Sequence, residues 1–118
     1  MSRGARILVV EDEAMVAMLI EDTLNDAGFK VLGPAATVAE AMAVLDAERP
    51  AGAVLDLNLG GETSAPVADR LAAEGVLFLI CSGYGASGVP PAHVGRPVLP
   101  KPYDPGELLR TMRRLLAR

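Results

Sequence analysis

With 118 residues, 51% of them hydrophobic and 22% charged, the chain has the size and composition of one folded domain and not those of a disordered protein. Its net charge of −4 argues against general nucleic-acid binding, which requires a basic surface, and no apolar stretch approaches the ~20 residues of a membrane span. The single cysteine cannot form an internal disulfide and no secretory leader pattern is present, so we expect a cytoplasmic protein without membrane insertion.

The chain begins with a predicted strand, a helix and a second strand. Residues 6–10 contain the apolar run Ile7–Val10 and are predicted as a buried strand, and residues 14–27 have the periodicity of an amphipathic helix that ends at Gly28. A second, shorter strand is predicted at residues 31–32. The predicted apolar face of the helix consists of Val16, Leu19, Ile20, Leu24 and Ala27.

Two capped helices flank the third predicted strand. Thr37 and Glu40 form a capping-box pattern at the start of a helix that stops before Pro50. The apolar run at residues 53–55 is the third strand, and Ser64 is placed to cap the helix that follows it. The alternation of strand and helix therefore continues through the middle of the chain.

The last third of the chain contains two strands separated by an interrupted segment, and then a helix. Residues 76–81 are strongly apolar, and residues 98–99 form a short fifth strand. The alternation of strands and helices predicts a helix in segment 83–97. However, relative to alanine, each interior glycine destabilises a helix by about 1 kcal/mol and each interior proline by about 3 kcal/mol. We therefore expect a short or irregular turn there. Asp104 and Glu107 repeat the capping-box pattern at the start of the last helix.

The character and order of these elements predict the fold class. Strands that are apolar throughout, without polar alternation, are typical of parallel sheets covered on both faces. Their alternation with helices predicts a doubly wound α/β fold with a five-stranded parallel sheet and a short or irregular fourth helix. Residues 1–118 contain no linker or internal repeat, so we expect a single domain with no output domain.

Polar side chains follow four of the predicted strands. Glu11 and Asp12 come after the first strand, Asp56 after the third, Ser82 after the fourth and Lys101 shortly after the fifth. The carboxyl ends of parallel strands meet at one edge of the sheet, where open α/β sheets bind ligands. We therefore expect these five side chains to form one site. Burying a carboxylate at the end of a strand, as at Asp56, costs folding free energy, so such a residue is expected to have a binding partner or a function.

Three of these residues form a candidate metal site. Glu11, Asp12 and Asp56 place three carboxylates together, and their like charges disfavour joint ionisation unless a cation is present. No His or Cys ligand of the zinc type lies nearby, and a few carboxylates with waters suit Mg²⁺. The backbone carbonyl of Asn58 offers a further ligand. The alternative is a polar loop rim that binds no metal.

Lys101 and Ser82 complete the requirements for phosphoryl transfer. A metal ion and a lysine offset charge on the phosphoryl oxygens, and a carboxylate, here Asp56, acts as the nucleophile. The alternative for Lys101 is a solvated surface lysine. Pro100 and Pro102 weaken that alternative because they stiffen the backbone on either side.

Together these motifs resemble the receiver domain of two-component response regulators, a flavodoxin-like fold, over nearly the whole chain. The segments that carry the resemblance are Val9–Glu13, Leu55–Asn58 and Lys101–Tyr103. The resemblance implies that Asp56 is phosphorylated by a sensor histidine kinase or a histidine phosphotransfer protein, and that the Lys101–Pro102 peptide bond is cis. It also implies a phosphoryl contact from Lys101, a switch role for the Ser82 hydroxyl, and Mg²⁺ bound by Glu11, Asp12, Asp56 and the carbonyl of Asn58.

A narrower resemblance is to the FATGUY subgroup of receivers. It is carried by Leu77–Gly85, Gly33–Thr37, Leu59–Glu62 and Val98–Tyr103. The subgroup usually has Phe-Ala-Thr where this chain has Ile80-Cys81-Ser82, and serine is less restricted in its rotamer than threonine. The subgroup also usually has a degenerate fourth helix. Tyr84 lies near the phosphoryl edge, where it either shields the acyl phosphate from water or is an exposed loop aromatic.

The leading interpretation is a stand-alone phosphorylation switch and not an enzyme with an external substrate. Its reactions are Mg²⁺-dependent phosphorylation and dephosphorylation of Asp56, and its output is phosphorelay or contact with an unknown downstream protein. One alternative is a small phosphatase of the haloacid-dehalogenase type, but such enzymes have an acidic residue where Asn58 lies. The other is a receiver-like scaffold that is not phosphorylated. For His93, the single histidine, no kinase-type motif supports a phosphohistidine role.

Overall fold

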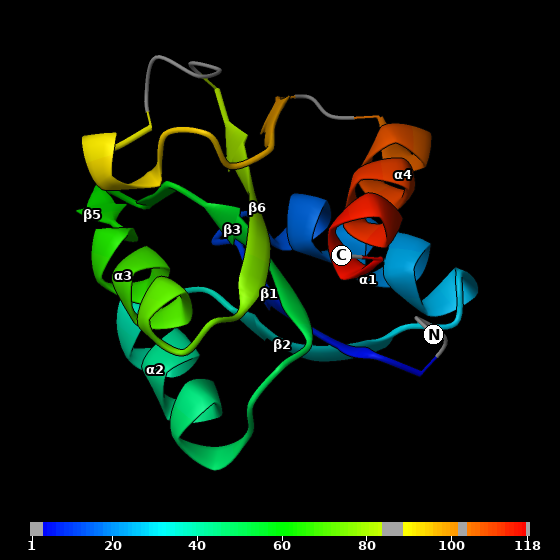
Figure 1. Cartoon of the computed structure of the whole chain (residues 1–118), viewed down its shortest axis with the longest axis horizontal. Helices are drawn as coiled ribbons and strands as arrows, with labels where there is room; N and C mark the ends of the chain where they lie inside the picture. The colour runs from blue at the N-terminus through cyan, green and yellow to red at the C-terminus, as the bar shows by residue number, and fades with distance from the viewer. Residues whose placement is uncertain (1–3, 84–88, 102–103, 118) are drawn as a thin grey trace.

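The computed structural model describes residues 4–83, 89–101 and 104–117, which form a three-layer α/β fold (Figure 1). A parallel sheet of five strands lies in the middle layer, in the order β2-β1-β3-β6-β7. Its strands are β1 (Arg6–Val10), β2 (Lys30–Ala35), β3 (Gly52–Asp56), β6 (Leu77–Ser82) and β7 (Val98–Pro100). Counted along the chain, this is the strand order of flavodoxin-like folds. The prediction of a doubly wound fold with five parallel strands is confirmed.

Two helices cover each face of the sheet (Figure 1). Helices α1 (Ala14–Asp26) and α4 (Pro105–Leu116) pack on one face, and α2 (Val38–Ala47) and α3 (Ala65–Ala73) pack on the other. Among the helices in the described part of the chain, none is both long and apolar enough to traverse a lipid bilayer.

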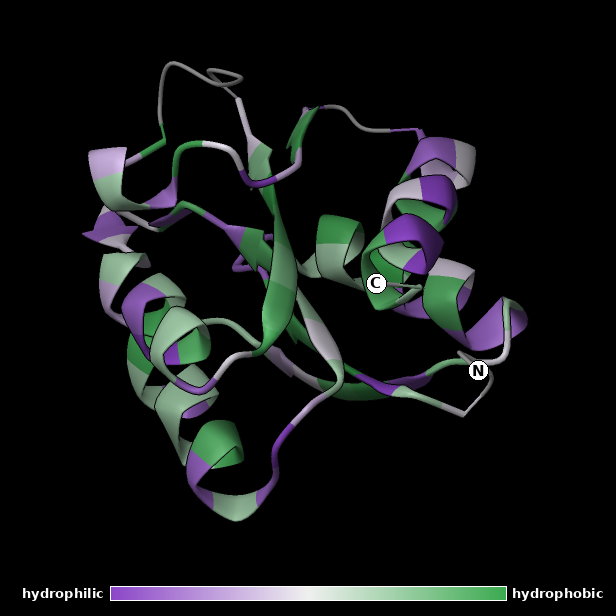
Figure 2. Cartoon of the chain, in the orientation of Figure 1, coloured by the Kyte–Doolittle hydropathy of each residue, from purple (hydrophilic) through white to green (hydrophobic). Residues whose placement is uncertain are grey.

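Side chains from each strand pack alternately into two apolar cores, one on each face of the sheet. In β1, Leu8 packs on the side of α2 and α3, whereas Ile7 and Val9 pack on the side of α1 and α4. Figure 2 shows the central strands as predominantly hydrophobic, whereas hydrophobic and hydrophilic residues alternate along the helices. Burial on both faces explains why the strand sequences show no polar alternation.

Two of the three predicted helix caps form as expected. Side-chain oxygens of Thr37 and Asp104 accept the backbone N–H three residues later, at 3.1 and 2.9 Å. Ser64 occupies the N-cap position of α3, but its hydroxyl makes no capping bond, so that prediction is wrong. The reason is that Ser64 is fully buried and lacks the extended backbone of a capping residue. The Thr63 hydroxyl instead accepts the N–H of Ala65 at 3.2 Å.

Strand β2 is longer than predicted and continues to Ala35 instead of ending at residue 32. Its pairing with β1 shifts near Gly33 and resumes where Val10 faces Ala35. Gly33 has a φ of +92°, and a Cβ atom there would lie 2.7 Å from the backbone nitrogen of Ala35. Glycine therefore allows the strand to pass an irregularity that a larger residue would not fit.

A short hairpin after β3 was not predicted. It consists of β4 (Asn58–Leu59) and β5 (Glu62–Thr63), which pair antiparallel. Gly60 and Gly61 form the turn between them with φ values of +62° and +90°. The hairpin lies between the carboxyl end of β3 and the start of α3.

The predicted apolar face of α1 is wrong at Leu19, which is 47% exposed. Its neighbours Met15 and Met18 are also exposed, at 84% and 60%. The buried stripe is narrow and follows the spacing i, i+3, i+7, and consists of Ala17, Ile20 and Leu24. One side of α1 therefore presents large apolar side chains at the surface.

The segment that joins β6 to β7, residues 83–97, is called the β6–β7 connection below. In its described part, residues 89–97, a single 3₁₀ turn at Pro91–His93 stands where a helix would be expected by symmetry. The prediction of a short or irregular turn is confirmed for these residues. His93 in this turn is only 3% exposed, which the sequence did not indicate.

Candidate functional site

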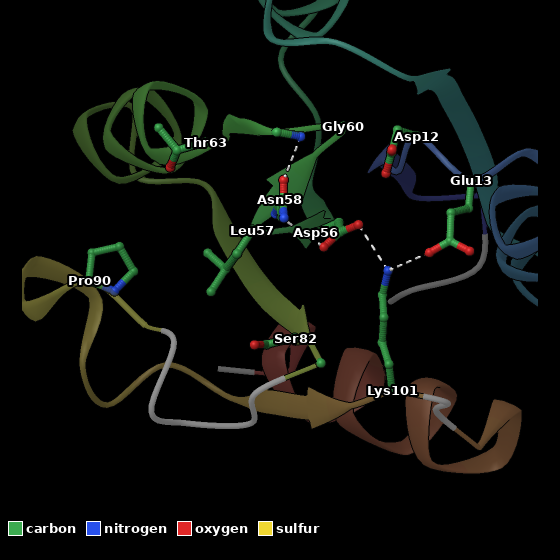
Figure 3. Close-up of a pocket in the computed structure, with 12 residues that line it drawn as sticks. Asp12, Glu13, Asp56, Leu57, Asn58, Gly60, Thr63, Ser82, Pro90 and Lys101 are labelled. Carbon is green, nitrogen blue, oxygen red and sulfur yellow. Dashed lines mark hydrogen bonds and ion pairs between the residues drawn. The ribbon is translucent and has the colours of Figure 1, made fainter.

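Four strands end at the same edge of the sheet, and the chain places a polar side chain at or directly after each end. Figure 3 shows Asp56, Ser82 and Lys101 at this edge. Asp56 is the last residue of β3 and Ser82 is the last residue of β6. Glu11 and Lys101 directly follow β1 and β7. The structure therefore brings together side chains that lie up to ninety positions apart in the sequence, counting from 11 to 101.

These strand ends surround a pocket of about 730 Å³, called the Asp56 pocket below. Buried Glu11 lies beside it, and Ser82 in its lining is 2% exposed. The lining includes Asp12, Asp56, Asn58, Ser82, Pro90 and Lys101. The pocket thus combines carboxylates, an ammonium group and a hydroxyl, and it is open to a ligand.

Lys101 is held by carboxylates from two strand ends and from the start of α1. Its Nζ lies 2.9 Å from Oδ2 of Asp56, 2.9 Å from Oε1 of Glu11 and 3.7 Å from Oε1 of Glu13. Figure 3 shows the Lys101 side chain directed at Asp56. With its side chain only 19% exposed, Lys101 is part of the site and not a solvated surface lysine.

The two oxygens of Asp56 have different partners. Oδ2 accepts a hydrogen bond from Lys101 at 2.9 Å, and Oδ1 accepts the backbone N–H of Asn58 at 3.2 Å. The side chain of Asn58 accepts the N–H of Gly61 at 2.9 Å, which ties the hairpin turn to the pocket. The position of the Asp56 carboxylate is therefore fixed by the loop that follows it and by Lys101.

Glu11, Asp12 and Asp56 fit the requirements of a divalent metal site. Each offers one carboxylate oxygen, and these three oxygens all lie within 4.8 Å of one another. Oε1 of Glu11 is buried at ion-pair distance from Lys101, yet within the described residues no hydrogen bond of acceptable geometry reaches it. An all-oxygen donor set suits a hard cation such as Mg²⁺. The chemistry of the donors therefore fits the predicted ion.

In the absence of metal, the electrostatics of the site shift the pKa of Glu11 toward neutral pH. Burial raises the pKa of Glu11 to about 7 from an ordinary value of 4.5, and the neighbouring Asp56 contributes, while Lys101 acts in the opposite direction. For Lys101, burial lowers the pKa, but the close contacts of its ammonium with the carboxylates of Asp56 and Glu11 outweigh burial and raise the pKa above its ordinary value. The lysine is therefore charged at neutral pH.

Replacing Glu11 with glutamine is expected to stabilise the metal-free protein by about 1–3 kcal/mol near pH 8, because the wild-type protein must then carry a buried charge. The folded pKa of about 7 exceeds the unfolded value of 4.5, so the stability contributed by Glu11 is complete below the unfolded pKa. It is lost as the pH rises through the folded pKa. Urea unfolding of both proteins near pH 5 and near pH 8 measures the difference.

The matched control for this measurement is Glu21→Gln on α1, away from the pocket. Added Mg²⁺ is expected to stabilise the wild type more than Glu11→Gln, because a metal that binds only the folded state raises its stability. A stability gain in Glu11→Gln that stays the same from acid to alkaline pH contradicts a charged, buried Glu11.

Several predicted features of the site are placed differently or lie outside the described residues. Glu13 was not predicted from the sequence as a site residue, although it is the last of three consecutive acidic residues. Its backbone N–H donates a hydrogen bond to Oε2 of Glu11 at 3.1 Å. Cys81 is buried and burial raises its pKa to about 12, which fits a small apolar core residue. Tyr84 and the Lys101–Pro102 peptide bond lie outside the described residues. The metal contact of the Asn58 carbonyl stays a prediction.

A family model and solved structures both relate this chain to response regulators. The family model of the response regulator receiver domain matches residues 7–113. A solved structure of SdrG from Sphingomonas melonis Fr1 is 38% identical in sequence, with a TM-score of 0.84 over 98% of this chain and 99% of that chain. The receiver domain of PhyR from Erythrobacter litoralis shares the fold, with a TM-score of 0.86 and 21% identity over 98% of this chain and 92% of that chain.

One curated relative is longer than this chain. The uncharacterized transcriptional regulatory protein YbdJ of Bacillus subtilis (strain 168) is 29% identical over 118 residues, which are 97% of this chain and 52% of YbdJ. The chain therefore spans about half the length of that relative. The family model covers most of the chain, including all four strand ends that form the pocket. The chain belongs to the response regulator receiver domain family.

Proposed function

We propose that this chain is a phosphorylation switch in which Asp56 accepts a phosphoryl group from a sensor histidine kinase or a histidine phosphotransfer protein. The observation that carries the proposal is the setting of Asp56. It is 6% exposed at the end of β3, in contact with the Lys101 ammonium and close to the carboxylates of Glu11 and Asp12. Glu11 and Asp56 are buried side by side, and burying two neighbouring carboxylates is costly for the fold, so their presence points to a function. Membership of the receiver family supports the same function.

The proposed reaction transfers one phosphoryl group between two proteins. An oxygen of the ionised Asp56 carboxylate bonds to phosphorus while the phosphorus–nitrogen bond of the donor phosphohistidine breaks. The leaving imidazole keeps the electron pair of that bond and takes a proton from solvent. Lys101, which now contacts Oδ2 of Asp56 at 2.9 Å, is within reach of the new phosphoryl oxygens and offsets their charge.

Glu11, Asp12, Asp56 and the carbonyl of Asn58 would hold Mg²⁺, which would supply further positive charge to offset that of the phosphoryl oxygens. Glu11 must be ionised to act as a ligand, and its pKa of about 7 makes this pH-dependent in the metal-free protein. Phosphorylation is therefore expected to weaken as the pH falls below neutral.

The Ser82 hydroxyl is assigned the role of contacting a phosphoryl oxygen and passing the change to the β6–β7 connection. Ser82 ends β6, lines the same pocket as Asp56, and its carbonyl accepts the N–H of Lys101 at 3.2 Å. Serine has fewer rotamer restrictions than threonine, so a less sharply two-state switch is expected. We also propose membership of the FATGUY subgroup, on the sequence of Leu77–Gly85.

The exposed side of α1 is suited to contact with a protein partner. Met15, Met18 and Leu19 are three of the four large apolar side chains exposed in the described part of the chain. Helix α1 begins directly after Glu13, which lines the Asp56 pocket, so the start of this helix lies beside the pocket. We assign the exposed side of α1 to docking of the phosphodonor. The downstream output is proposed to be protein contact or phosphorelay, without turnover of an external substrate.

The phosphatase alternative has less support. A phosphatase of this kind needs a general acid close to its nucleophile, and the amide of Asn58 cannot donate a proton for this purpose. The Asn58 side chain is also engaged by Gly61 in the hairpin turn. The scaffold alternative does not explain why Asp56 and Lys101 are paired in the pocket, since a protein that is not phosphorylated has no need of either residue there.

Incubation with acetyl phosphate and Mg²⁺ tests the proposal. The intact mass is expected to rise by one phosphoryl group, about 80 Da, and removal of Mg²⁺ with a chelator is expected to prevent the gain. Steady release of inorganic phosphate without an adduct supports the phosphatase instead. An absence of both, together with no spectral response to beryllofluoride, supports the scaffold.

A further inference from the structure

His93 makes an interaction that the phosphorylation chemistry does not use. Its ring is buried in the 3₁₀ turn of the β6–β7 connection, and its Nε2 lies 2.8 Å from Oδ1 of Asp69 on α3. The Asp69 side chain is 67% exposed, so the pair joins a buried ring to a carboxylate at the surface. An ionised carboxylate only accepts hydrogen bonds, so Nε2 carries the proton and donates it.

The remaining contacts of His93 hold its ring in one orientation. Nδ1 is buried and has no hydrogen-bond partner in the part of the chain that the structure describes. The ring packs edge-on against Phe78 of β6, with centroids 5.7 Å apart, and the Arg96 guanidinium lies 4.1 Å from the Phe78 ring centroid. Asp69 is thus the polar partner of the ring among the described residues, and the other contacts are packing.

Two of the chain segments that line the Asp56 pocket bear on this contact. One wall comes from the hairpin that leads into α3 and includes Gly60, Gly61 and Thr63. The other wall includes Gly83 and Pro90 of the β6–β7 connection. Figure 3 shows Thr63 and Pro90 at the rim of the pocket.

The His93–Asp69 contact joins these two walls. Asp69 lies in α3, which starts two residues after Thr63. The N–H of His93 donates to the carbonyl of Pro90 at 2.9 Å, so the turn that contains the histidine also positions the pocket residue. Movement of His93 away from α3 therefore moves Pro90 as well.

We propose that His93 and Asp69 form a clasp that holds residues 89–97 of the β6–β7 connection against α3 and sets the width of the Asp56 pocket. His93 is a positioning residue in this proposal, because it acts through Pro90 and does not touch the reacting atoms. A closed clasp limits the access of water to phosphorylated Asp56 and slows loss of the phosphoryl group. The effect on phosphoryl loss rests on the proposed phosphorylation of Asp56, whereas attachment of the connection does not.

The clasp is tested with Asp69→Ala, which removes an exposed partner and leaves the buried ring in place. Two quantities are measured: amide hydrogen exchange at His93 and Arg96 in the unphosphorylated protein, and the rate of phosphoryl loss after labelling with acetyl phosphate and Mg²⁺. Both are expected to increase, the rate of loss by about two- to fivefold, as suits the loss of one partly exposed hydrogen bond.

Two further variants serve as matched controls. Asp46→Ala removes an exposed carboxylate of equal charge that pairs with Arg70 away from the pocket, and is expected to change neither quantity. Asp69→Asn keeps an oxygen that accepts the Nε2–H of His93, and is expected to restore slow exchange and slow phosphoryl loss. If Asp69 only stabilised the fold, Asp69→Ala would speed phosphoryl loss only by lowering global stability. The clasp instead predicts faster loss in Asp69→Ala, and slow loss in Asp69→Asn, at the same global stability.

Three results overturn the clasp. In the first, Asp69→Ala leaves hydrogen exchange at His93 and Arg96 unchanged, as Asp46→Ala is expected to do. In the second, Asp69→Ala speeds this exchange but does not change the rate of phosphoryl loss. In the third, Asp69→Asn shows the same fast exchange and phosphoryl loss as Asp69→Ala. If the wild-type protein takes up no phosphoryl group at all, the proposed function fails, and the exchange measurement alone then confirms or overturns attachment of the connection by His93.

Discussion

Replacing Asp56 with asparagine is expected to abolish uptake of phosphate from acetyl phosphate. A carboxamide is not a nucleophile for phosphorus under these conditions, whereas an ionised carboxylate is. The substitution is nearly isosteric, and the asparagine oxygen still accepts a hydrogen bond from the N–H of Asn58 or from Lys101. Removing one of the clustered negative charges is also expected to leave the fold as stable as the wild type or more so.

Intact mass spectrometry over a time course measures this effect, and Asp22→Asn on the exposed side of α1 is the matched control. The control is expected to be labelled at the wild-type rate. Labelling of Asp56→Asn at a rate close to that of the wild type contradicts the assignment of Asp56 as the acceptor.

Replacing Lys101 with methionine is expected to slow phosphorylation of Asp56 by about 100-fold or more, the usual effect of removing one preorganised group that stabilises developing charge. Methionine keeps much of the apolar stem but removes the ammonium that lies 2.9 Å from both Asp56 and Glu11. The site then contains Glu11, Asp12 and Asp56 without their paired cation. Protonation of Glu11 is favoured further, because Lys101 acts to lower its pKa.

Lys30→Met provides the control, because Lys30 is an exposed lysine at the start of β2. Initial rates of labelling with acetyl phosphate are compared at saturating Mg²⁺, so that any loss of metal affinity is separated from loss of charge stabilisation. A Lys101→Met rate within about threefold of the control shows that the ammonium is not needed in the transition state.

The residues at strand ends could be predicted from sequence because their positions depend on local pattern and topology. Apolar runs before Glu11, Asp56 and Ser82 identify buried strands, and parallel strands necessarily bring their carboxyl ends to one edge. No side-chain detail is required for that step. Lys101 was accessible by the same reasoning, since it directly follows the short strand β7.

His93 could not be placed by such reasoning, because its burial depends on contacts distant in sequence. Its polar partner Asp69 is 24 positions away, and its aromatic partner Phe78 lies on another element. The surrounding glycines and prolines gave only the expectation of an irregular turn. Local sequence pattern reports backbone preference, and it does not report which distant surface a turn will pack against.

The β4–β5 hairpin was also missed from the sequence, and Leu19 was placed on the buried face of α1, for similar reasons. The two-residue strands β4 and β5 are too short to produce a periodic pattern, and the Gly60–Gly61 pair is the one local signal for their turn. On α1, the predicted apolar face included Leu19 because methionine, leucine and valine occur on more than one side of the helix. Which side is buried is decided by the sheet and α4, not by the helix itself.

Chemical location of the phosphoryl group is the most direct test of Asp56 as the phosphoacceptor. After labelling with acetyl phosphate and Mg²⁺, borohydride reduction converts a phosphorylated aspartate to homoserine, and tandem mass spectrometry of proteolytic peptides identifies the converted position. We expect homoserine in place of Asp56, only in samples that contained Mg²⁺. Conversion of Asp12 instead, phosphate retained on Ser82 or His93, or no conversion at any position contradicts phosphoryl transfer to Asp56.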